Sequence, residues 1–198
     1  MIDDIYALCD MELLRRFDLT LEDFVRIAKR FNASILQYRD KQGLANQKNQ
    51  RLKRLRELWE KTLIVNDEIA LARFCDGVHI GQEDLQNVME GFGAKSKNEA
   101  IVIVRKLSGA KVVGLSTHTL QEIEEANELD IDYIGLGAYR ASRTKKVEYV
   151  LGPELSRLAK ESKHNVVAIG GVQLFDHIEN VWKKAIGTDL VIKALTYA

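Results

Sequence analysis

The feature that most constrains the fold is an alternation of short β-type runs with helix-type stretches along the whole chain. The β-type runs are rich in Val, Ile and Leu and mostly lack apolar–polar alternation, which is typical of strands covered on both faces. We predict strands at residues 5–10, 34–40, 62–67, 77–81, 111–117, 132–139, 165–171 and 190–195. We predict helices at residues 20–30, 44–59, 120–129, 153–161 and 174–184, whereas residues 85–107 are compatible with strand or helix.

Eight such strands, nearly all followed by a helix, predict an α/β protein that folds as a single (β/α)8 TIM barrel over residues 1–198. An open doubly wound sheet is the alternative, because strand number alone separates the two folds poorly. The chain is compact for a barrel, whose typical length is about 250 residues. Because it ends at Ala198, we expect the last helix to be missing and the eighth strand to be covered by a partner subunit, as in a homodimer.

Composition narrows the function classes. The 29 basic and 29 acidic residues cancel, which argues against broad attraction to nucleic acid or membrane surfaces. The N-terminus lacks the basic region and long apolar core of a signal peptide, and no apolar run is long enough to span a membrane. Cys9 and Cys75 are too few for a disulfide framework and form no Cys-x-x-Cys pattern. These features indicate a reduced, cytoplasmic protein with small-molecule substrates.

Polar residues follow most of the predicted strands, which favours the barrel over the open sheet. Barrel active sites are built from several strands at their C-terminal ends. The polar positions are Asp10, Gln37 to Lys41, Asn66-Asp67, Gly81 to Asp84, Ser116 to His118, Ser142 to Lys145, Gly170-Gly171 and Lys193.

The positions that follow the second strand point to an anionic ligand. Gln37, Arg39 and Lys41 are spaced two apart, so on a strand they project to one side. Arg offers a planar fork to phosphate oxygens and Lys a mobile point charge, so a diphosphate would suit them. The alternative is that Arg39 and Lys41 lie past the barrel and pair with Asp40 or Asp67.

Two carboxylates at neighbouring strand ends, Asp67 and Asp84, predict a metal site. Both strands would end on the same rim, and oxygen ligands favour Mg2+ over zinc. The alternative is that Asp67 caps a short helix from residue 68 onward. We interpret His79 as a core histidine with satisfied hydrogen bonds.

Two further segments suit phosphate. Gly170-Gly171 would let the backbone approach an anion closely, with the N-terminus of the next helix directed at it. Ser142, Arg143, Thr144 and Lys145 offer two hydroxyls and two cations. Each signal is weak alone, and either segment could be an ordinary turn or loop.

Together, in this order, these clusters resemble the thiamine phosphate synthase and TenI family over nearly the whole chain. The resemblance is carried by Gln-x-Arg-x-Lys at 37–41, Asn66-Asp67, Gly-Gln-Glu-Asp at 81–84, Gly-x-Ser-x-His at 114–118, Tyr-Ile-Gly-Leu-Gly at 133–137 with the loop 142–145, and Ile-Gly-Gly at 169–171. Any one motif is modest, but the set is specific.

The resemblance implies a transferase that joins an aminopyrimidine diphosphate to a thiazole phosphate with loss of pyrophosphate. It implies that the aminopyrimidine diphosphate is held by Gln37, Tyr38, Arg39, Asp40, Lys41, Asn66, Ser116 and Lys145, and that Asp67 and Asp84 hold Mg2+ on it. It implies that the thiazole phosphate is held by Ser142, Arg143, Thr144, Gly171, Ile192 and Lys193. Arg39, Lys41, Ser116 and Lys145 would be the catalytic residues.

The sequence departs from the family pattern mainly on the thiazole side. The loop at 138–142 lacks the usual prolines, Lys193 stands where a serine usually follows the eighth strand, and residues 85–110 are longer than usual. A TenI-like thiazole tautomerase with His118 as its acid and base is therefore an alternative, as is a non-catalytic binder of a phosphorylated ligand. The intact diphosphate and metal side favours the synthase.

Overall fold

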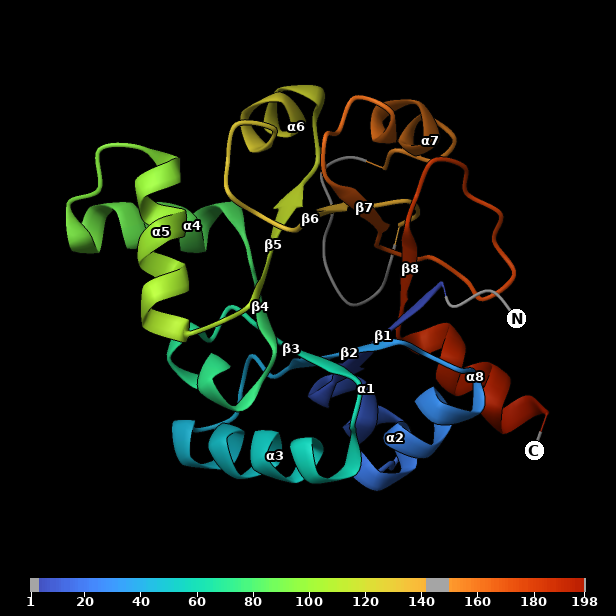
Figure 1. The fold of residues 1–198 in the computed structure, drawn as a ribbon. Coiled ribbons are helices and arrows are strands. Elements are labelled where there is room, and N and C mark those ends of the chain that lie inside the picture. The colour runs from blue at the N-terminus through green and yellow to red at the C-terminus, as the bar shows by residue number, and fades with distance from the viewer. Residues whose placement is uncertain (1–3, 142–149, 198) are drawn as a thin grey trace.

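The computed structural model describes residues 4–141 and 150–197. In them, parallel strands close into a barrel in the order β1-β2-β3-β4-β5-β6-β7-β8, and β8 pairs with β1 (Figure 1). The strands are β1 (Ile5–Asp10), β2 (Ile35–Arg39), β3 (Thr62–Asn66), β4 (Gly77–Ile80), β5 (Val112–Thr117), β6 (Tyr133–Leu136), β7 (Asn165–Ala168) and β8 (Lys183–Ile186). The predicted (β/α)8 barrel is confirmed.

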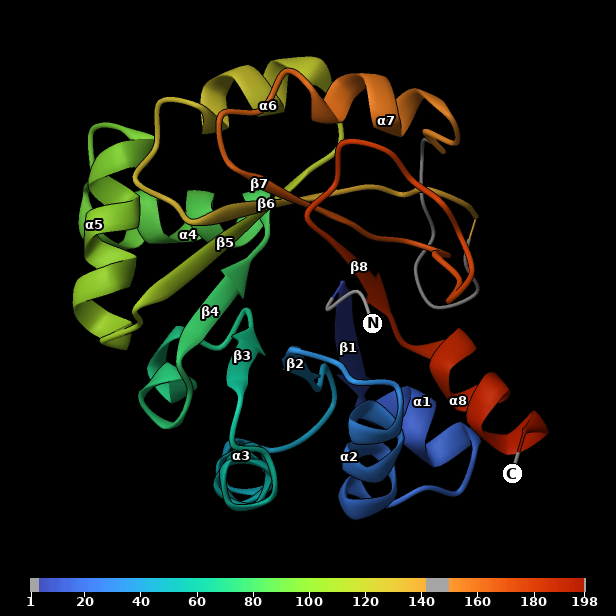
Figure 2. The same cartoon turned by 45° about the vertical axis from the view of Figure 1, so that its right-hand side comes forward.

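Helices surround the barrel, as the turned view in Figure 2 makes clear. They are α1 (Met11–Arg16), α2 (Leu21–Arg30), α3 (Ala45–Leu58), the 3-10 helix η1 (Ile69–Phe74), α4 (Gln82–Phe92), α5 (Lys97–Ser108), α6 (Leu120–Ala126), α7 (Glu154–Ala159) and α8 (Thr188–Thr196). Local signals explain several starts. Thr20 caps α2 in a reciprocal capping box with Asp23, and Thr119 caps α6. Among the residues described, no helix is long and apolar enough to cross a membrane.

Two layers of buried side chains hold the fold together. The larger lies between the strands and the helices and includes Trp59, Phe24 and Leu55, all fully buried. The smaller fills the barrel interior and consists of Tyr6, Ile35, Ile64, Tyr133, Val167 and Ala185. Two of these six side chains carry hydroxyl groups, so the centre of the barrel is partly polar.

The prediction from sequence was wrong at the C-terminal end of the chain, from residue 174 onward. The predicted eighth strand at 190–195 is wrong, because these residues belong to α8, and the strand is Lys183–Ile186. The predicted absence of a last helix is therefore also wrong, since α8 follows β8 and removes the reason for covering that strand with a partner subunit. The homodimer itself stays a prediction. The ambiguous residues 85–107 form most of α4 and α5.

The misplacement has a physical cause in two lysines. Lys183 and Lys184 make β8 look polar, yet both are buried, at 5% and 9% exposure. The ammonium group of Lys184 donates to the carbonyl oxygens of Leu174 (3.0 Å) and Asp176 (3.1 Å) and pairs with Asp4 (3.2 Å). The predicted helix at 174–184 is wrong as well, because residues 172–182 form an irregular connection that these contacts hold against β8.

Candidate active site

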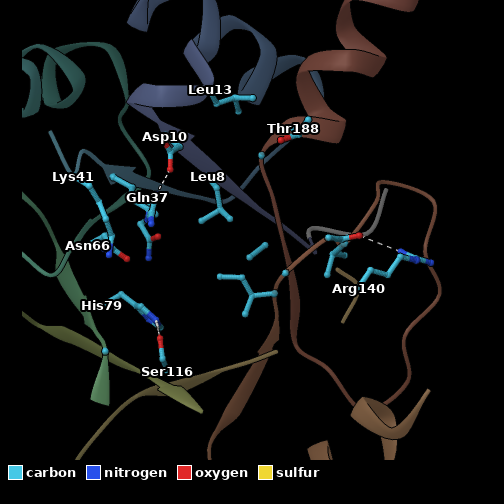
Figure 3. Close-up of a pocket in the computed structure, with 18 of the residues that line it drawn as sticks. Leu8, Asp10, Leu13, Gln37, Lys41, Asn66, His79, Ser116, Arg140 and Thr188 are labelled. Atoms are coloured by element: carbon cyan, nitrogen blue, oxygen red, sulfur yellow. Dashed lines mark hydrogen bonds and ion pairs between the residues drawn. The ribbon is translucent and has the colours of Figure 1, made fainter. Parts of the chain in front are cut away.

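A cavity of about 930 Å3 opens at the C-terminal ends of the strands. Its lining includes nine of the residues that the sequence singled out for binding, catalysis or metal ligation. They are Gln37, Arg39, Lys41, Asn66, Asp67, Asp84, Ser116, Gly171 and Ile192. In Figure 3, Asp10, Gln37, Lys41 and Asn66 lie on one side of the cavity, and Arg140 and Thr188 lie on the other.

Alternation along β2 turns Gln37 and Arg39 into the cavity. Arg39 is 21% exposed and its guanidinium forms an ion pair with Asp10, at the end of β1. Asp10 also accepts a hydrogen bond from the backbone N–H of Glu12 (2.8 Å), which fixes its carboxylate at the start of α1. Asp10 was not among the predicted site residues. Its position as the last, polar residue of a buried strand was the signal that could have found it.

The other two predicted residues of this motif turn away from the cavity. Tyr38 is buried on the outside of the barrel, and its hydroxyl donates to Asp40 (3.0 Å). Asp40 also accepts from Arg51 of α3 (2.6 Å) and from the backbone N–H of Gly43 (2.8 Å). Burial acts to raise the pKa of Asp40, but these hydrogen bonds outweigh it and hold the pKa below its usual value. Tyr38 and Asp40 therefore support the loop that carries Lys41.

Asp67 and Asp84 meet on the same side of the cavity as Arg39 and Lys41. The pKa of Asp67 is raised to about 6, chiefly by burial and then by the charge of Asp84. Asp67 has φ +62°, an uncommon left-handed conformation outside glycine. No side chain caps η1, so the alternative role of Asp67 as a helix cap is wrong. The ammonium group of Lys41 lies 4.0 Å from the Asp67 carboxylate.

A divalent cation between these two carboxylates would offset the repulsion from Asp84, which after burial is the second cause of the raised pKa of Asp67. Within 4–141 and 150–197, no group of three or more His, Cys, Asp or Glu side chains could form a metal cage. Mg2+ commonly binds through one or two carboxylates and takes its other ligands from water and substrate phosphates. The donor set therefore fits Mg2+ better than a metal that needs a closed protein site.

The floor of the cavity is polar and ordered. His79 is 4% exposed, and its Nδ1 lies 3.1 Å from the Tyr133 hydroxyl while its Nε2 lies 3.0 Å from Ser116 Oγ. The interpretation of His79 as a buried histidine with satisfied hydrogen bonds is confirmed, although it also lines the cavity. His118, at the rim, pairs with Glu122 through Nδ1 (3.1 Å).

The other side of the cavity is built from glycine backbone. Gly170 and Gly171 both have left-handed φ values, +83° and +68°. A Cβ on Gly170 would lie 2.5 Å from Ala138 Cβ, and one on Gly171 would lie 2.8 Å from Arg140 Cβ. Only glycine fits there. Arg140 donates to the Gly171 carbonyl (3.2 Å) and pairs with Asp176, so a cation is fixed beside this turn.

The helix N-terminus that points into this side is not the one predicted. We predicted that the next helix after Gly171, at 174–184, would point there, but the helix that begins at the cavity is α8, with Gly187, Thr188 and Asp189 in the lining. Residues Gly187 to Asp189 were missed because the eighth strand was misplaced. Once β8 ends at Ile186, Thr188 is the hydroxyl residue that follows it, so Lys193 does not mark the end of the eighth strand.

The remaining predicted residues fall into two groups. Ile192 lines the cavity, whereas Lys193 is not in the lining and its ammonium lies over the rings of Phe175 (5.5 Å) and Tyr197 (5.9 Å). The predicted loop residues lie outside the described part of the chain. They are Ser142, Arg143, Thr144 and Lys145.

Together, these groups form two anion-compatible regions in one cavity. Arg39, Lys41 and the carboxylate pair suit a metal-bound polyphosphate, and the glycine turn with the α8 N-terminus suits a single phosphate. The described lining offers no Ser-His-Asp or Cys-His arrangement for covalent catalysis. The cavity is therefore suited to positioning two phosphorylated ligands against each other.

Known proteins that are similar to this chain include enzymes named for a phosphorylated product. The family described as "Thiamine monophosphate synthase" matches residues 5–195. The "Thiamine-phosphate synthase" of Prochlorococcus marinus is 30% identical over 98% of this chain, and "Thiamine-phosphate synthase 1" of Aquifex aeolicus is 33% identical over 85%. The "Thiamine biosynthesis bifunctional protein ThiED" of Geobacter sulfurreducens is 38% identical over 71%.

The matched lengths differ among these relatives. The alignments span 54% of the Prochlorococcus protein, 27% of the Geobacter protein and 74% of the Aquifex protein. Among solved structures, the thiamine phosphate pyrophosphorylase of Pyrococcus furiosus superposes with a TM-score of 0.73 at 22% identity, over 98% of this chain and 96% of that one. That similarity supports the fold. With the family match over residues 5–195, it follows that this chain belongs to the thiamine monophosphate synthase (TMP-TENI) family.

Proposed function

We propose that this protein is a thiamine phosphate synthase, which joins an aminopyrimidinylmethyl diphosphate to a thiazole phosphate and releases pyrophosphate. The observation that carries the proposal is that Arg39, Lys41, Asp67 and Asp84 converge on one side of a cavity whose other side is built for a second phosphate. A tautomerase that acts on a single phosphorylated thiazole does not need the diphosphate-binding residues Arg39, Lys41, Asp67 and Asp84.

The proposed reaction exchanges one bond for another. The bond between the pyrimidinylmethyl carbon and the diphosphate oxygen breaks, and its electron pair leaves with pyrophosphate. The lone pair of the thiazole ring nitrogen then forms the new C–N bond, so the positive charge ends on the thiazolium ring. No protein nucleophile is required, and the residues act by holding charge where it develops.

Each polar group has a place in this scheme. Arg39, fixed by Asp10, and Lys41 bind oxygens of the leaving diphosphate. Ser116 and, outside the described residues, Lys145 are the further groups that we assign to that diphosphate. Gly171 and the N-terminus of α8 at Thr188 bind the thiazole phosphate.

Asp67 and Asp84 would hold Mg2+. The ion supplies charge neutralisation for the departing diphosphate.

We also propose that the protein works in the reducing cytoplasm, which suits its two free cysteines, Cys9 and Cys75.

The second candidate is the TenI-like tautomerase, and the pair formed by His118 and Glu122 at the cavity rim is the observation that favours it. A histidine held by a carboxylate can transfer a proton near neutral pH. Such an enzyme would convert a thiazole carboxylate phosphate without the diphosphate substrate.

A product assay separates the candidates. Purified protein is incubated with both substrates and Mg2+, and thiamine phosphate and pyrophosphate are measured; a parallel reaction contains only the thiazole carboxylate phosphate. We expect thiamine phosphate, and we expect Asp84→Asn to lose turnover by at least about 100-fold. Glu90→Gln, an exposed acid on the same helix α4, is the control and keeps full activity. Tautomerised thiazole without thiamine phosphate would establish the second candidate instead.

A further inference from the structure

A chain of hydrogen bonds crosses the interior of the barrel beneath the cavity. Gln37 Nε2 donates to the Tyr6 hydroxyl (2.9 Å), and the hydroxyls of Tyr6 and Tyr133 lie 2.9 Å apart. The Tyr133 hydroxyl lies 3.1 Å from His79 Nδ1, and His79 Nε2 lies 3.0 Å from Ser116 Oγ. This hydrogen-bond chain therefore begins at Gln37 and ends at Ser116, which both line the cavity, whereas Tyr6 and Tyr133 are not among the lining residues.

The barrel makes room for this chain with two glycines in neighbouring strands. A Cβ on Gly114 would lie 2.1 Å from the ring of Tyr133, and a Cβ on Gly135 would lie 2.9 Å from the ring of His79. Contacts below 3.0 Å are not tolerated without movement of the ring. Gly114 pairs with both His79 and Tyr133 in the strand register. The two glycine positions of the Gly-x-Ser-x-His and Tyr-Ile-Gly motifs thus serve the hydrogen-bond chain.

Counting protons gives the chain a direction. Burial raises the pKa of both Tyr6 and Tyr133, so each hydroxyl keeps its one proton and can donate only once. The Tyr6 hydroxyl accepts from Gln37, and the Tyr133 hydroxyl is the other hydrogen-bond partner that the structure gives it. We therefore assign the proton of Tyr6 to Tyr133 and the proton of Tyr133 to His79 Nδ1. A neutral imidazole that accepts at Nδ1 carries its proton on Nε2. That proton is then donated to Ser116 Oγ.

We propose that Tyr6 and Tyr133 are positioning residues that hold His79 in its Nε2–H tautomer and thereby turn the hydroxyl proton of Ser116 into the cavity. Since Ser116 Oγ accepts from His79, its own proton is available to a ligand. For the proposed synthase reaction, on which this role rests, Ser116 then acts as a hydrogen-bond donor to a diphosphate oxygen as charge builds there.

Nitrogen NMR of the whole protein tests the direction of the chain without reference to activity. The protein is labelled with 15N-histidine, and the ring signals of His79 are assigned among the four histidines by their loss in His79→Asn. We expect Nε2 to carry the proton and Nδ1 to resonate as a nitrogen that accepts a hydrogen bond. In Tyr133→Phe, the Nδ1 signal should move to the position of an unbonded ring nitrogen. A wild-type Nδ1–H tautomer would overturn the proposal.

Kinetics test the positioning role. Hydrogen bonds that orient metal-ligating histidines are worth about 10- to 100-fold in activity, and we expect Tyr133→Phe to fall at the lower end, with kcat about tenfold lower and a smaller change in KM. Ile64→Val, which trims the same interior layer without touching a hydroxyl, is the control and should leave both the NMR signals and kcat near wild type. Full kcat in Tyr133→Phe would refute the role.

The two readouts also separate this proposal from the proposed function. If the wild-type protein makes no thiamine phosphate, the synthase assignment fails, whereas the His79 signals still decide whether the chain runs as described.

Discussion

The carboxylate pair at the cavity allows a quantitative test of the site through stability alone. Burial, and then the charge of Asp84, raises the pKa of Asp67 from its usual 3.8 to about 6, while its side chain remains 28% exposed. At about 1.4 kcal/mol per pH unit, this shift is worth up to about 3 kcal/mol. Folding therefore favours the protonated form of Asp67.

The sign follows from proton linkage. Between pH 3.8 and about 6 the folded state binds more protons at Asp67 than the unfolded chain does, so the free energy of unfolding falls as pH rises. Below pH 3.8 the folded and unfolded states both hold the proton, so this group adds no pH dependence. Above about pH 6 both have released it, and the fall in unfolding free energy is complete. Asp67→Asn lacks this dependence and should be more stable than the wild type at neutral pH by up to about 3 kcal/mol, without metal.

The assay is urea denaturation with a chelator present, at about pH 4 and about pH 7, for the wild type and Asp67→Asn. The difference between the two proteins is compared between the two pH values, which cancels the titration of all other groups. Asp84→Asn removes the charge of Asp84 but leaves Asp67 buried, so the pH dependence of its unfolding free energy should lie between those of the wild type and Asp67→Asn. If the unfolding free energies of the wild type and Asp67→Asn changed equally between the two pH values, the raised pKa of Asp67 would be refuted. Adding Mg2+ at pH 7 should stabilise the wild type but not Asp67→Asn.

Three other substitutions test separate parts of the structure. Thr188→Ala should raise the KM for the thiazole phosphate about tenfold by removing a polar contact worth about 1.4 kcal/mol, whereas Lys193→Ala should leave it unchanged; equal effects would reject the placement of α8. Gly114→Ala should displace the ring of Tyr133 and reduce both stability and kcat, measured by urea denaturation and steady-state kinetics; a neutral result would show that the ring has room. Asp40→Asn, which weakens a buried ion pair, should cost about 3 kcal/mol of unfolding free energy, and an unchanged urea midpoint would contradict this.

Much of the fold could be predicted because parallel strands covered on both faces leave uninterrupted apolar runs. The first seven strands follow this rule, and their order with intervening helices was enough to indicate a closed barrel. The eighth strand breaks the rule. Lys183 and Lys184 are both buried, and the ammonium group of Lys184 is held by the carbonyl oxygens of Leu174 and Asp176 and by Asp4. Hydropathy carries no information about such contacts.

In the candidate site, too, some residues could be predicted from local sequence, whereas others depend on contacts that the sequence does not show. Asp67 and Ser116 at strand ends, and Asp84 in the first turn of α4 after β4, were found because the C-terminal ends of barrel strands meet at one rim. Tyr38 and Asp40 were included because they stand in the same motif as Arg39. Alternation along β2 turns them to the opposite face, where Arg51 of α3 binds Asp40. Thr188 was missed for a non-local reason, since its role depends on where β8 ends.

The partly polar barrel centre has a consequence for engineering. Barrels of this kind usually fill their centres with branched aliphatic side chains, and stability-guided redesign would replace Tyr6 and Tyr133 with such residues. The resulting protein would lose the hydrogen bonds of Gln37 Nε2 and His79 Nδ1 to the two hydroxyls, but it would still bind phosphorylated ligands at the rim. It would nevertheless be a poor catalyst, although every residue in contact with the ligands had been kept.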